Sequence, residues 1–313
     1  MPFVQIKEVS KVYQQVPVLE GVTLNIEEGD LYGVIGESGS GKTTLLNVLT
    51  GFLPPSSGEV LISHSSTEEP WNVIRGLHQF KSWVGFMPQH NAFYPKLTIK
   101  ENLFHFGKLY NLKQETLVTN AKSLLQFTQL FDHRNKLAEH LSDGMQRRLD
   151  LACSLIHKPK LLVLDEPTAE LDPVLQEEIL QLLQQINRQG ITIVLASHHL
   201  EGIENICNKV AILHRGRVHT QGLMEEIKKP FLKEKLTINI RSGGNKQMLL
   251  DTLQKLPVDK IVDKGNQVII YPADIERTVN TLLRLIKEEH LYLNDLDVRK
   301  PTLHEIFNRI TAS

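Results

Sequence analysis

The chain has 313 residues, of which 41% are hydrophobic and 23% are charged, and its formal net charge is −1. This composition is typical of a globular protein with a sizeable core and enough length for two domains. The balanced charge argues against a general electrostatic hold on nucleic acid. No apolar run approaches the ~20 residues that a membrane-spanning helix needs.

The start of the chain and its cysteines indicate a reducing compartment. Residues Met1–Val4 enter a strand pattern without the basic and apolar regions of a signal peptide. Only two cysteines occur, Cys153 and Cys207, and we expect both to be buried free thiols. We therefore expect a soluble protein that reaches a membrane only through another subunit.

The first 50 residues contain the most informative pattern in the chain. Residues 3–35 alternate apolar and polar side chains, which predicts strands with a turn at residues 28–30. The apolar run 31–35 reads as a buried strand, residues 44–49 read as a helix, and Gly-Glu-Ser-Gly-Ser-Gly-Lys-Thr lies between them at 36–43. This order predicts the phosphate-binding loop of a nucleoside triphosphatase, and the alternative is a chance glycine-rich turn.

Each residue type of this loop has a physical task. The glycines let the backbone curl so that its N–H groups, at the positive N-terminus of a helix, face the β- and γ-phosphates. Lys42 adds a mobile positive charge, and the Thr43 hydroxyl is placed to ligate Mg²⁺. The candidate ATP-binding residues of this segment are Gly36, Glu37, Ser38, Gly39, Ser40, Gly41, Lys42, Thr43 and Thr44.

The next hundred residues change from strand to helix. Residues 58–63 predict a strand, residues 64–82 a polar loop with a short helix, and residues 98–158 a mostly helical segment. Thr98 is expected to be an N-cap, with Glu101 completing a capping box. We expect an inserted helical subdomain at about residues 90–158.

Two short apolar runs follow, at residues 161–165 and 191–196, and both predict central strands covered on both faces. The first run delivers Asp165 and Glu166 at its carboxyl end, which is where open parallel sheets bind ligands. We expect Asp165 to hold Mg²⁺ and Glu166 to polarise the attacking water. Taken alone, an apolar run that ends in Asp-Glu also fits a capped strand-to-helix turn.

The fold class expected from these elements is α/β for residues 1–228, with a separate accessory domain at residues 229–313. In the second part, strand patterns lie at 236–240, 258–262, 268–271 and 291–298, and helical patterns at 245–256, 275–286 and 302–310. The order β-α-β-β-α-β predicts a small α+β, ferredoxin-like domain.

A third motif identifies the family that this chain resembles. Residues 141–148 read Leu-Ser-Asp-Gly-Met-Gln-Arg-Arg and precede the Asp-Glu strand. This segment resembles the Leu-Ser-Gly-Gly-Gln signature of the ATP-binding cassette (ABC) family, with Asp143 in place of the first Gly and Met145 in place of Gln. The paired Arg147 and Arg148 read as structural residues of the helix that follows the signature.

Other family elements follow in order over residues 1 to about 228. Tyr13 matches the aromatic residue that stacks on adenine, and Gln89 matches the glutamine that joins the core to the helical segment. Asp172, in Ala-Glu-Leu-Asp at 169–172, matches the loop after the Asp-Glu strand, and His198 matches the switch histidine. Taken alone, Tyr13 also fits a half-buried strand aromatic and Gln89 a solvated loop residue.

The resemblance implies an ATPase that works as a dimer. Two cassettes pack head to tail around two ATP molecules, and each supplies its signature to the ATP held by the other. The residues that would act in this way are Leu141, Ser142, Asp143, Gly144 and Met145. Ser142 is expected to cap the signature helix, and Gly144 to allow close approach of backbone to phosphate. The resemblance also implies catalytic roles for Glu166, His198, Gln89 and Lys42, and Mg²⁺ ligands at Thr43, Gln89 and Asp165.

Asp143 is the main departure from the family pattern. A carboxylate suits a helix N-terminus but should repel a γ-phosphate. We expect the Asp143 side chain to turn away and cap the helix, which would leave a modest ATPase activity.

The resemblance implies the ATPase subunit of an ABC transporter, with ATP and Mg²⁺ as cofactors and a homodimer of cassettes that serves a separate permease. The segment after Gln89, with Phe93, Tyr94 and Leu97, resembles the surface that receives the permease's coupling helix, and the C-terminal stretch 298–307 resembles that of export-type cassettes. We expect the cytoplasmic face of the cell membrane as its location and no nucleic-acid partner. The alternative function is a soluble ABC ATPase that acts on ribosomes or DNA. The C-terminal domain could serve dimerisation or stability, or could regulate the ATPase by binding a ligand.

Overall fold

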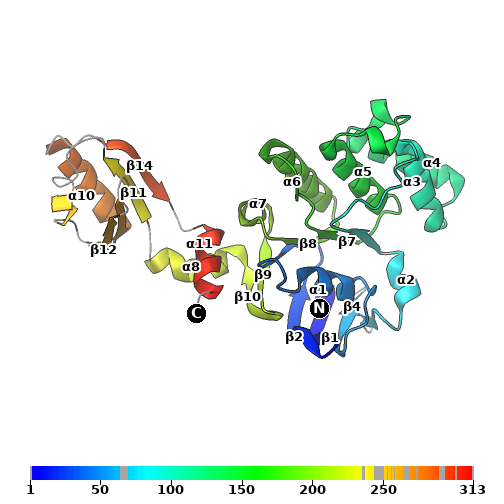
Figure 1. Ribbon diagram of the computed structural model, residues 1–313, viewed down its shortest axis with the longest axis horizontal. Helices are drawn as coiled ribbons and strands as arrows, with labels where there is room; N and C mark the ends of the chain where they lie inside the picture. The colour runs from blue at the N-terminus through cyan, green and yellow to red at the C-terminus, as the bar shows by residue number, and fades with distance from the viewer. Residues whose placement is uncertain are drawn as a thin grey trace. The chain divides into compact units, whose positions relative to one another are not determined.

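The chain divides into two compact units, Met1–Met224 and Glu225–Ser313, which are described separately (Figure 1). The computed structural model describes residues 2–63, 70–234, 237–242, 250–251, 253–254, 256, 258–263, 268–272, 274–288, 293–299 and 302–311.

The first unit contains two sheets, of which one is antiparallel with the order β2-β1-β4-β5. Its strands are β1 (Val4–Tyr13), β2 (Val16–Ile26), β4 (Ser57–Ile62) and β5 (Trp71–Asn72). Alternate residues Val4, Ile6 and Val9 of β1 are buried in the core, as a strand with one covered face requires.

The second sheet is mixed and has the order β10-β9-β3-β8-β7-β6. Its strands are β3 (Leu31–Ile35), β6 (Val84–Met87), β7 (Leu161–Asp165), β8 (Thr192–Ser197), β9 (Lys209–His214) and β10 (Arg217–Leu223). All neighbours pair in parallel except β9 and β10. The apolar runs predicted as central strands are β7 and β8, and every residue of β3, β7 and β8 is buried.

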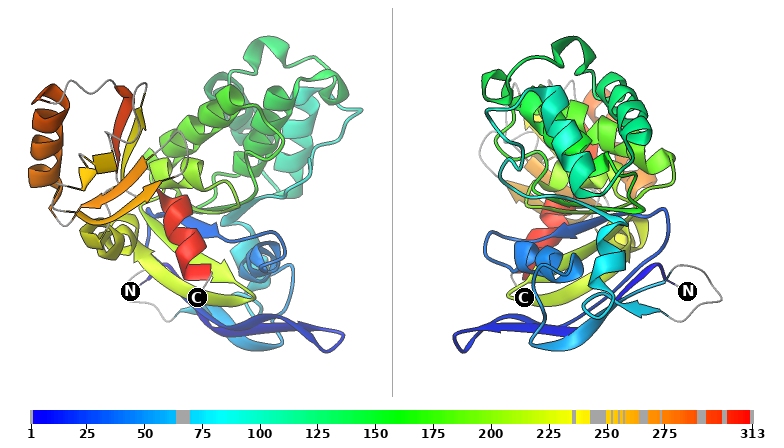
Figure 2. Two further views of the ribbon diagram at one scale, coloured as in Figure 1. Left: turned by 60° about the vertical axis from the view of Figure 1, so that its left-hand side comes forward. Right: turned by 90° about the vertical axis from the view of Figure 1, so that its right-hand side faces the viewer.

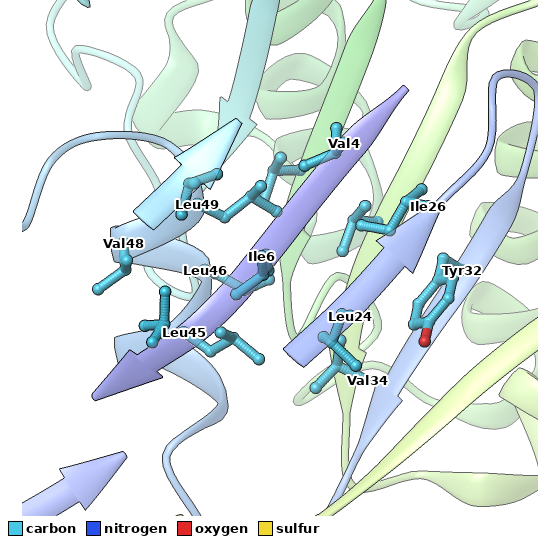
Figure 3. Close-up of a cluster of buried hydrophobic side chains, with 14 of the residues drawn as sticks. Val4, Ile6, Leu24, Ile26, Tyr32, Val34, Leu45, Leu46, Val48 and Leu49 are labelled. Atoms are coloured by element: carbon cyan, nitrogen blue, oxygen red, sulfur yellow. The ribbon is translucent and has the colours of Figure 1, made fainter. Parts of the chain in front are cut away.

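Helix α1 (Lys42–Leu49) packs in the main core of this unit. Its residues Leu45, Leu46, Val48 and Leu49 form one buried cluster with strand residues that include Ile6 (Figure 3). The other helices of this unit outside the inserted segment include α2 (Leu77–Lys81), α6 (Pro173–Arg188) and α7 (Leu200–Ile206). The packing of α1 holds the loop that precedes it close to the end of β3.

The helices of the inserted segment lie together (Figures 1 and 2), and the chain enters this segment after β6, an edge strand of the sheet. It contains α3 (Ile99–Leu109), α4 (Gln114–Phe127), the 3-10 turns η1 (Phe131–His133) and η2 (Ala138–His140), and α5 (Asp143–Leu155). The capping box predicted at α3 is confirmed, because Glu101 N donates to Thr98 Oγ1 (3.2 Å) and Thr98 N donates to Glu101 Oε2 (2.8 Å). The segment has a hydrophobic cluster of its own, which contains the buried free thiol of Cys153.

The second unit is built on an antiparallel sheet with the order β12-β13-β11-β14. Its strands are β11 (Thr237–Ser242), β12 (Val258–Asp263), β13 (Val268–Pro272) and β14 (Leu293–Arg299), and its helices include α10 (Ile275–Glu288) and α11 (Leu303–Thr311). Helix α8 (Met224–Glu234) begins at the last residue of the first unit. This strand order is that of the predicted ferredoxin-like module. The helix predicted at 245–256 and the turn predicted at 263–266 lie partly outside the described residues.

His157 joins the helical segment to β6 just after the end of α5. Its ring stacks on Tyr110 at a centroid distance of 3.6 Å, and its Nε2 lies 3.1 Å from Val84 O. Because a carbonyl oxygen can only accept, Nε2 carries the proton of the neutral ring. Burial lowers the pKa of His157 to about 4, although the contact with Val84 O opposes this shift.

This shift predicts a pH-dependent stability. The folded chain binds fewer protons at His157 than the unfolded chain between the two pKa values, so this contribution is present above the ordinary pKa and is lost as the pH falls towards the folded value. Between about pH 7 and about pH 5 we expect the chain to lose about 2 kcal/mol of unfolding free energy that a His157→Gln variant keeps. Urea unfolding of both proteins at the two pH values measures the difference, and equal losses would contradict the assignment.

Candidate nucleotide-binding site

The candidate site lies at the carboxyl edge of the parallel strands. Strands β3, β8, β7 and β6 are consecutive neighbours, and their register aligns their ends: Ile35 pairs with Ser197, Asp165 with Ala196, and Met87 with Leu164. Each strand is followed by a segment that the sequence analysis singled out. The sheet therefore gathers four segments that are far apart along the chain.

The phosphate-binding loop owes its shape to its glycines. Gly39 and Gly41 adopt φ values of 79° and 105°, which side chains disfavour. A Cβ at Gly36 would lie 2.3 Å from Leu213 O, so this position has no room for a side chain. Helix α1 begins at Lys42 with Gly41 as its N-cap, two residues before the predicted start, and its free N–H groups therefore lie at the loop.

Lys42 is buried, and its ammonium group is hydrogen-bonded to the phosphate-binding loop. Its Nζ donates to Gly36 O (2.9 Å) and Glu37 O (3.1 Å), and it lies 3.6 Å from Glu166 Oε1. The Lys42 and Glu166 side chains are only 7% and 8% exposed. A positive charge is thus fixed beside the amide groups that would face a phosphate.

Glu166 follows β7 in a left-handed conformation, with φ 50°. Its Oε2 lies 2.9 Å from His198 Nδ1 and accepts a hydrogen bond from His198 N (3.3 Å). A non-glycine residue in this region is strained and is typically retained at functional sites. The structure thus brings Glu166 and His198, predicted from separate motifs, into direct contact.

A pocket of about 380 Å³ lies between these groups. Its lining residues are Val18, Ser38, Gly39, Gly41, Lys42, Thr43, Thr44, Gln89, Glu166 and His198. Nine of these ten were predicted from the sequence, and Val18 was not. Val18 is one of many alternating apolar residues in β2, so only the fold distinguishes it from its neighbours.

Two oxygen groups are of the kind that Mg²⁺ binds: Thr43, which lines this pocket, and Asp165, which lies outside its lining. The Thr43 side chain hydrogen-bonds Asp165, and among the described residues Asp165 Oδ1 is buried without a hydrogen-bond partner. Burial raises the pKa of Asp165 above its ordinary value, and the hydrogen bond from Thr43 opposes this. No cluster of three His, Cys, Asp or Glu residues suited to a metal occurs in the described part of the chain. Hydroxyl and carboxylate oxygens are among the ligand types that Mg²⁺ accepts.

Tyr13 does not line this pocket. It lies at the end of β1, where it pairs with Val16 of β2, and its ring is 42% exposed. The ammonium group of Lys11 lies 5.4 Å from the ring centroid. The exposed ring has a face available for stacking. Tyr13 is paired with β2, and Val18 of the same strand lines the pocket.

The signature segment lies at the start of α5, and its residues do not line the pocket. Ser142 occupies the N-cap position, but its hydroxyl makes no capping hydrogen bond, so the prediction of a side-chain cap is wrong. Asp143 is exposed and is the first helical residue rather than the cap, so the prediction that it caps the helix is also wrong. Because both groups face water, neither needs a protein partner, and the Asp143 carboxylate still suits the positive helix end.

The remaining predicted residues have structural contacts. Leu141 is buried and Met145 partly buried in the hydrophobic cluster of the helical segment. Asp172 is the N-cap of α6, and its Oδ1 accepts from Val174 N (2.9 Å) and Leu175 N (3.1 Å). Ser40 is buried, and its Oγ has no hydrogen-bond partner among the described residues.

Comparisons with known proteins agree with this geometry. The family model described as ABC transporter matches residues 19–169, and that of the ATP-binding protein DrrA1-3-like, C-terminal domain matches residues 222–311. The daunorubicin resistance ATP-binding protein DrrA3 of Streptomyces coeruleorubidus is 31% identical over 96% of this chain and 93% of that protein. The linearmycin resistance ATP-binding protein LnrL of Bacillus subtilis is 27% identical over 98% of both chains.

Two solved structures extend the comparison. The cbiO1 protein of Clostridium perfringens, part of an ABC transporter complex, has a TM-score of 0.65 and 26% identity, and the match covers 82% of this chain and 96% of that one. A dimeric ATP-binding cassette in a post-hydrolysis state, bound to ADP and Pi, has a TM-score of 0.63 and 28% identity, with 71% and 98% covered. The expected α/β cassette fold is confirmed.

Proposed function

We propose that this chain, which belongs to the ABC transporter family as an ATP-binding protein, hydrolyses ATP in a homodimer of cassettes and thereby drives a separate export permease. The chain is an ATP-binding ATPase subunit of a transporter. The observation that carries the proposal is the convergence of Lys42, Glu166, His198 and Gln89 on one pocket beside a phosphate-binding loop.

The proposed chemistry divides among these residues. The amide groups at the start of α1 and the Lys42 ammonium hold the β- and γ-phosphates and stabilise the charge that develops on phosphoryl transfer. Glu166 polarises the attacking water, and His198 orients the Glu166 carboxylate through its Nδ1 contact. Thr43, Asp165 and Gln89 would hold Mg²⁺, which neutralises phosphate charge when bound. Tyr13 would stack on the adenine.

The position of the signature segment supports the homodimer. Leu141–Met145 do not line the pocket, and Ser142 and Asp143 are exposed at the start of α5. The N-terminus of α5 attracts anions, so a second copy of the chain could bring this end to the γ-phosphate. A solved relative of this cassette is a dimer, which supports the proposal.

Export through a separate permease is supported by the relatives. Their names refer to linearmycin resistance, daunorubicin resistance and, for a protein of Rhizobium etli that is 28% identical over 100% of this chain and 94% of its own, Nod factor export. None of the helices that the structure describes has both the length and the apolar character needed to cross a bilayer. We propose that the permease holds the cassette at the cytoplasmic face of the membrane. Nothing observed favours the alternative of an ATPase that acts on ribosomes or DNA.

We further propose residues 1–228 as the cassette and residues 229–313 as an accessory domain that serves dimerisation or stability. A regulatory role through ligand binding remains the alternative for this domain.

Replacement of Glu166 by Gln tests the ATPase mechanism and the dimer together. The amide keeps the shape of the side chain but cannot polarise water, so we expect turnover to fall at least ~100-fold while ATP binding persists. The trapped nucleotide should also convert monomer to dimer in gel filtration when ATP and Mg²⁺ are supplied, and EDTA should abolish this. Hydrolysis by the variant at the parent rate would refute the assignment of Glu166.

The Asp143→Gly variant tests the departure from the signature pattern. If the exposed carboxylate repels the γ-phosphate in the dimer, its removal should raise the steady-state ATPase rate by about threefold to tenfold and lower the ATP concentration needed for dimerisation. Turnover measured at several ATP concentrations gives both values. A large fall in rate would show instead that Asp143 contributes to catalysis.

The separate permease can be tested by coexpressing this chain with a candidate multi-span permease and measuring whether the two copurify. Tyr94, 47% exposed and 4.6 Å from the His105 ring, belongs to the predicted docking segment. We expect Tyr94→Asp to abolish copurification, because a charge would replace an aromatic contact. The control is Val118→Asp on α4, a residue with the same exposure. Equal retention of the two variants would exclude Tyr94 from the interface.

A further inference from the structure

One face of α5 holds the backbone of the segment that carries Gln89. Arg147 Nη1 donates to Gln89 O (2.9 Å), and Ala92 N donates to Asp150 Oδ1 (2.9 Å). Asn91 Nδ2 donates to Gln146 Oε1 (2.6 Å). Three successive anchor points in residues 89–92 are therefore bonded to three side chains within little more than one turn of the signature helix.

Two of these side chains are charged and buried. Arg147 is 7% exposed and Asp150 is 3% exposed, and neither touches the nucleotide pocket. Burial raises the pKa of Asp150 to about 6, although the amides of Ala92 and Phe93 and the charge of Arg147 oppose the shift. Charged groups are costly to bury, and they are found inside proteins where hydrogen bonds fix them in one geometry.

The segment 89–92 lies between two elements of different kinds. Before it, β6 is fixed in the sheet by its pairing with β7. After it comes the helical segment, to which α5 belongs. The Gln89 side chain lines the pocket with Glu166 and His198, while its carbonyl oxygen is bonded to α5. A shift of α5 relative to β7 would therefore displace Gln89.

The contacts also lead back to the signature segment. Gln146, which accepts from Asn91, donates through its Nε2 to Leu141 O (3.0 Å). The start of α5 and the segment of Gln89 are thus bonded to the same side chain.

We propose that Arg147 and Asp150 are positioning residues that clamp residues 89–92 to α5, so that the placement of the signature helix sets the position of Gln89 beside the phosphates. This clamp rests on the proposed function, because it acts on hydrolysis only through Gln89. In the proposed dimer, the signature helix of one protomer contacts the ATP bound by its partner. Through the clamp, a movement of that helix also displaces Gln89 beside the ATP bound by its own protomer.

The test uses two adjacent arginines of the full chain. Arg147→Met removes the donor to Gln89 O, whereas Arg148→Met removes a guanidinium that bonds only Glu178, Gln129 and Thr128 O among the described residues. We expect Arg147→Met to lower kcat for ATP about tenfold and to change KM by less than about twofold, because the phosphate-binding loop is intact. We expect Arg148→Met to change kcat by less than about twofold. Equal losses in the two variants would overturn the clamp.

A double-mutant cycle separates positioning from a general structural effect. In a Gln89→Ala background the side chain that the clamp positions is gone, so Arg147→Met should lower kcat by less than about a further twofold. An undiminished tenfold loss in that background would overturn the proposal.

Amide hydrogen exchange tests the clamp without a measurement of ATPase activity. We expect the Ala92 amide to exchange faster in Arg147→Met than in Arg148→Met, and equal rates would overturn the clamp. If Arg147→Met fails to fold, Asp150→Leu replaces it, compared with Asp150→Asn, which keeps an acceptor oxygen for Ala92 N. If the unmodified chain hydrolyses no ATP, the proposed function fails, and exchange at Ala92 still decides whether the clamp exists.

Discussion

The register of the parallel strands is the constraint on which the site depends. Strands β3, β8, β7 and β6 end together, so the phosphate-binding loop, His198, Glu166 and Gln89 meet although more than 100 residues separate the loop from His198. A shift of β7 by one residue would exchange its two faces and withdraw Glu166 from the pocket. Burial on both faces fixes that register, because every residue of β3, β7 and β8 is enclosed. The buried strand residues that form the hydrophobic core therefore also hold the candidate site residues in place.

The buried pair of Lys42 and Glu166 joins the phosphate-binding loop to the proposed general base. The two charges lie 3.6 Å apart in a poorly hydrated site, and Lys42 also donates to two carbonyl oxygens of its own loop. A triphosphate that enters offers this lysine anionic acceptors that are stronger than carbonyl oxygens. Lys42 therefore lies between carbonyl oxygens of the phosphate-binding loop and the Glu166 carboxylate, and His198 Nδ1 lies 2.9 Å from the other oxygen of that carboxylate. The loop, Lys42, Glu166 and His198 thus form one connected set of polar contacts.

Much of this site could be predicted from the sequence, because its elements have strong local patterns. The glycine-rich loop, the Asp-Glu strand end and the Thr98 capping box are each specified within a few neighbouring residues. Strands β6, β9 and β10 were not predicted, because their identity comes from pairing with distant strands. The predictions of side-chain caps at Ser142 and Asp143 were wrong for another reason. A capping pattern shows which side chain can hydrogen-bond the start of a helix, but not whether that side chain hydrogen-bonds water instead. The acceptor of Arg147 lies 58 residues away, so no local pattern could have found it.

The two departures at the signature become intelligible from the packing of α5 on α6. A Cβ at Gly144 would lie 2.8 Å from the Leu175 side chain, and Leu175 belongs to the first turn of α6, which Asp172 caps. Gly144 therefore lets α5 and α6 approach closely, and a side chain there would make the end of the Leu175 side chain move. Asp143 lies one residue earlier, is exposed and has an ordinary helical backbone, so a side chain is accommodated there without a steric cost. Met145 packs on the helical cluster, where a flexible apolar side chain is well suited. The glycine of this motif thus lies where α5 and α6 pack closely, whereas Asp143 and Met145 lie where side chains are accommodated.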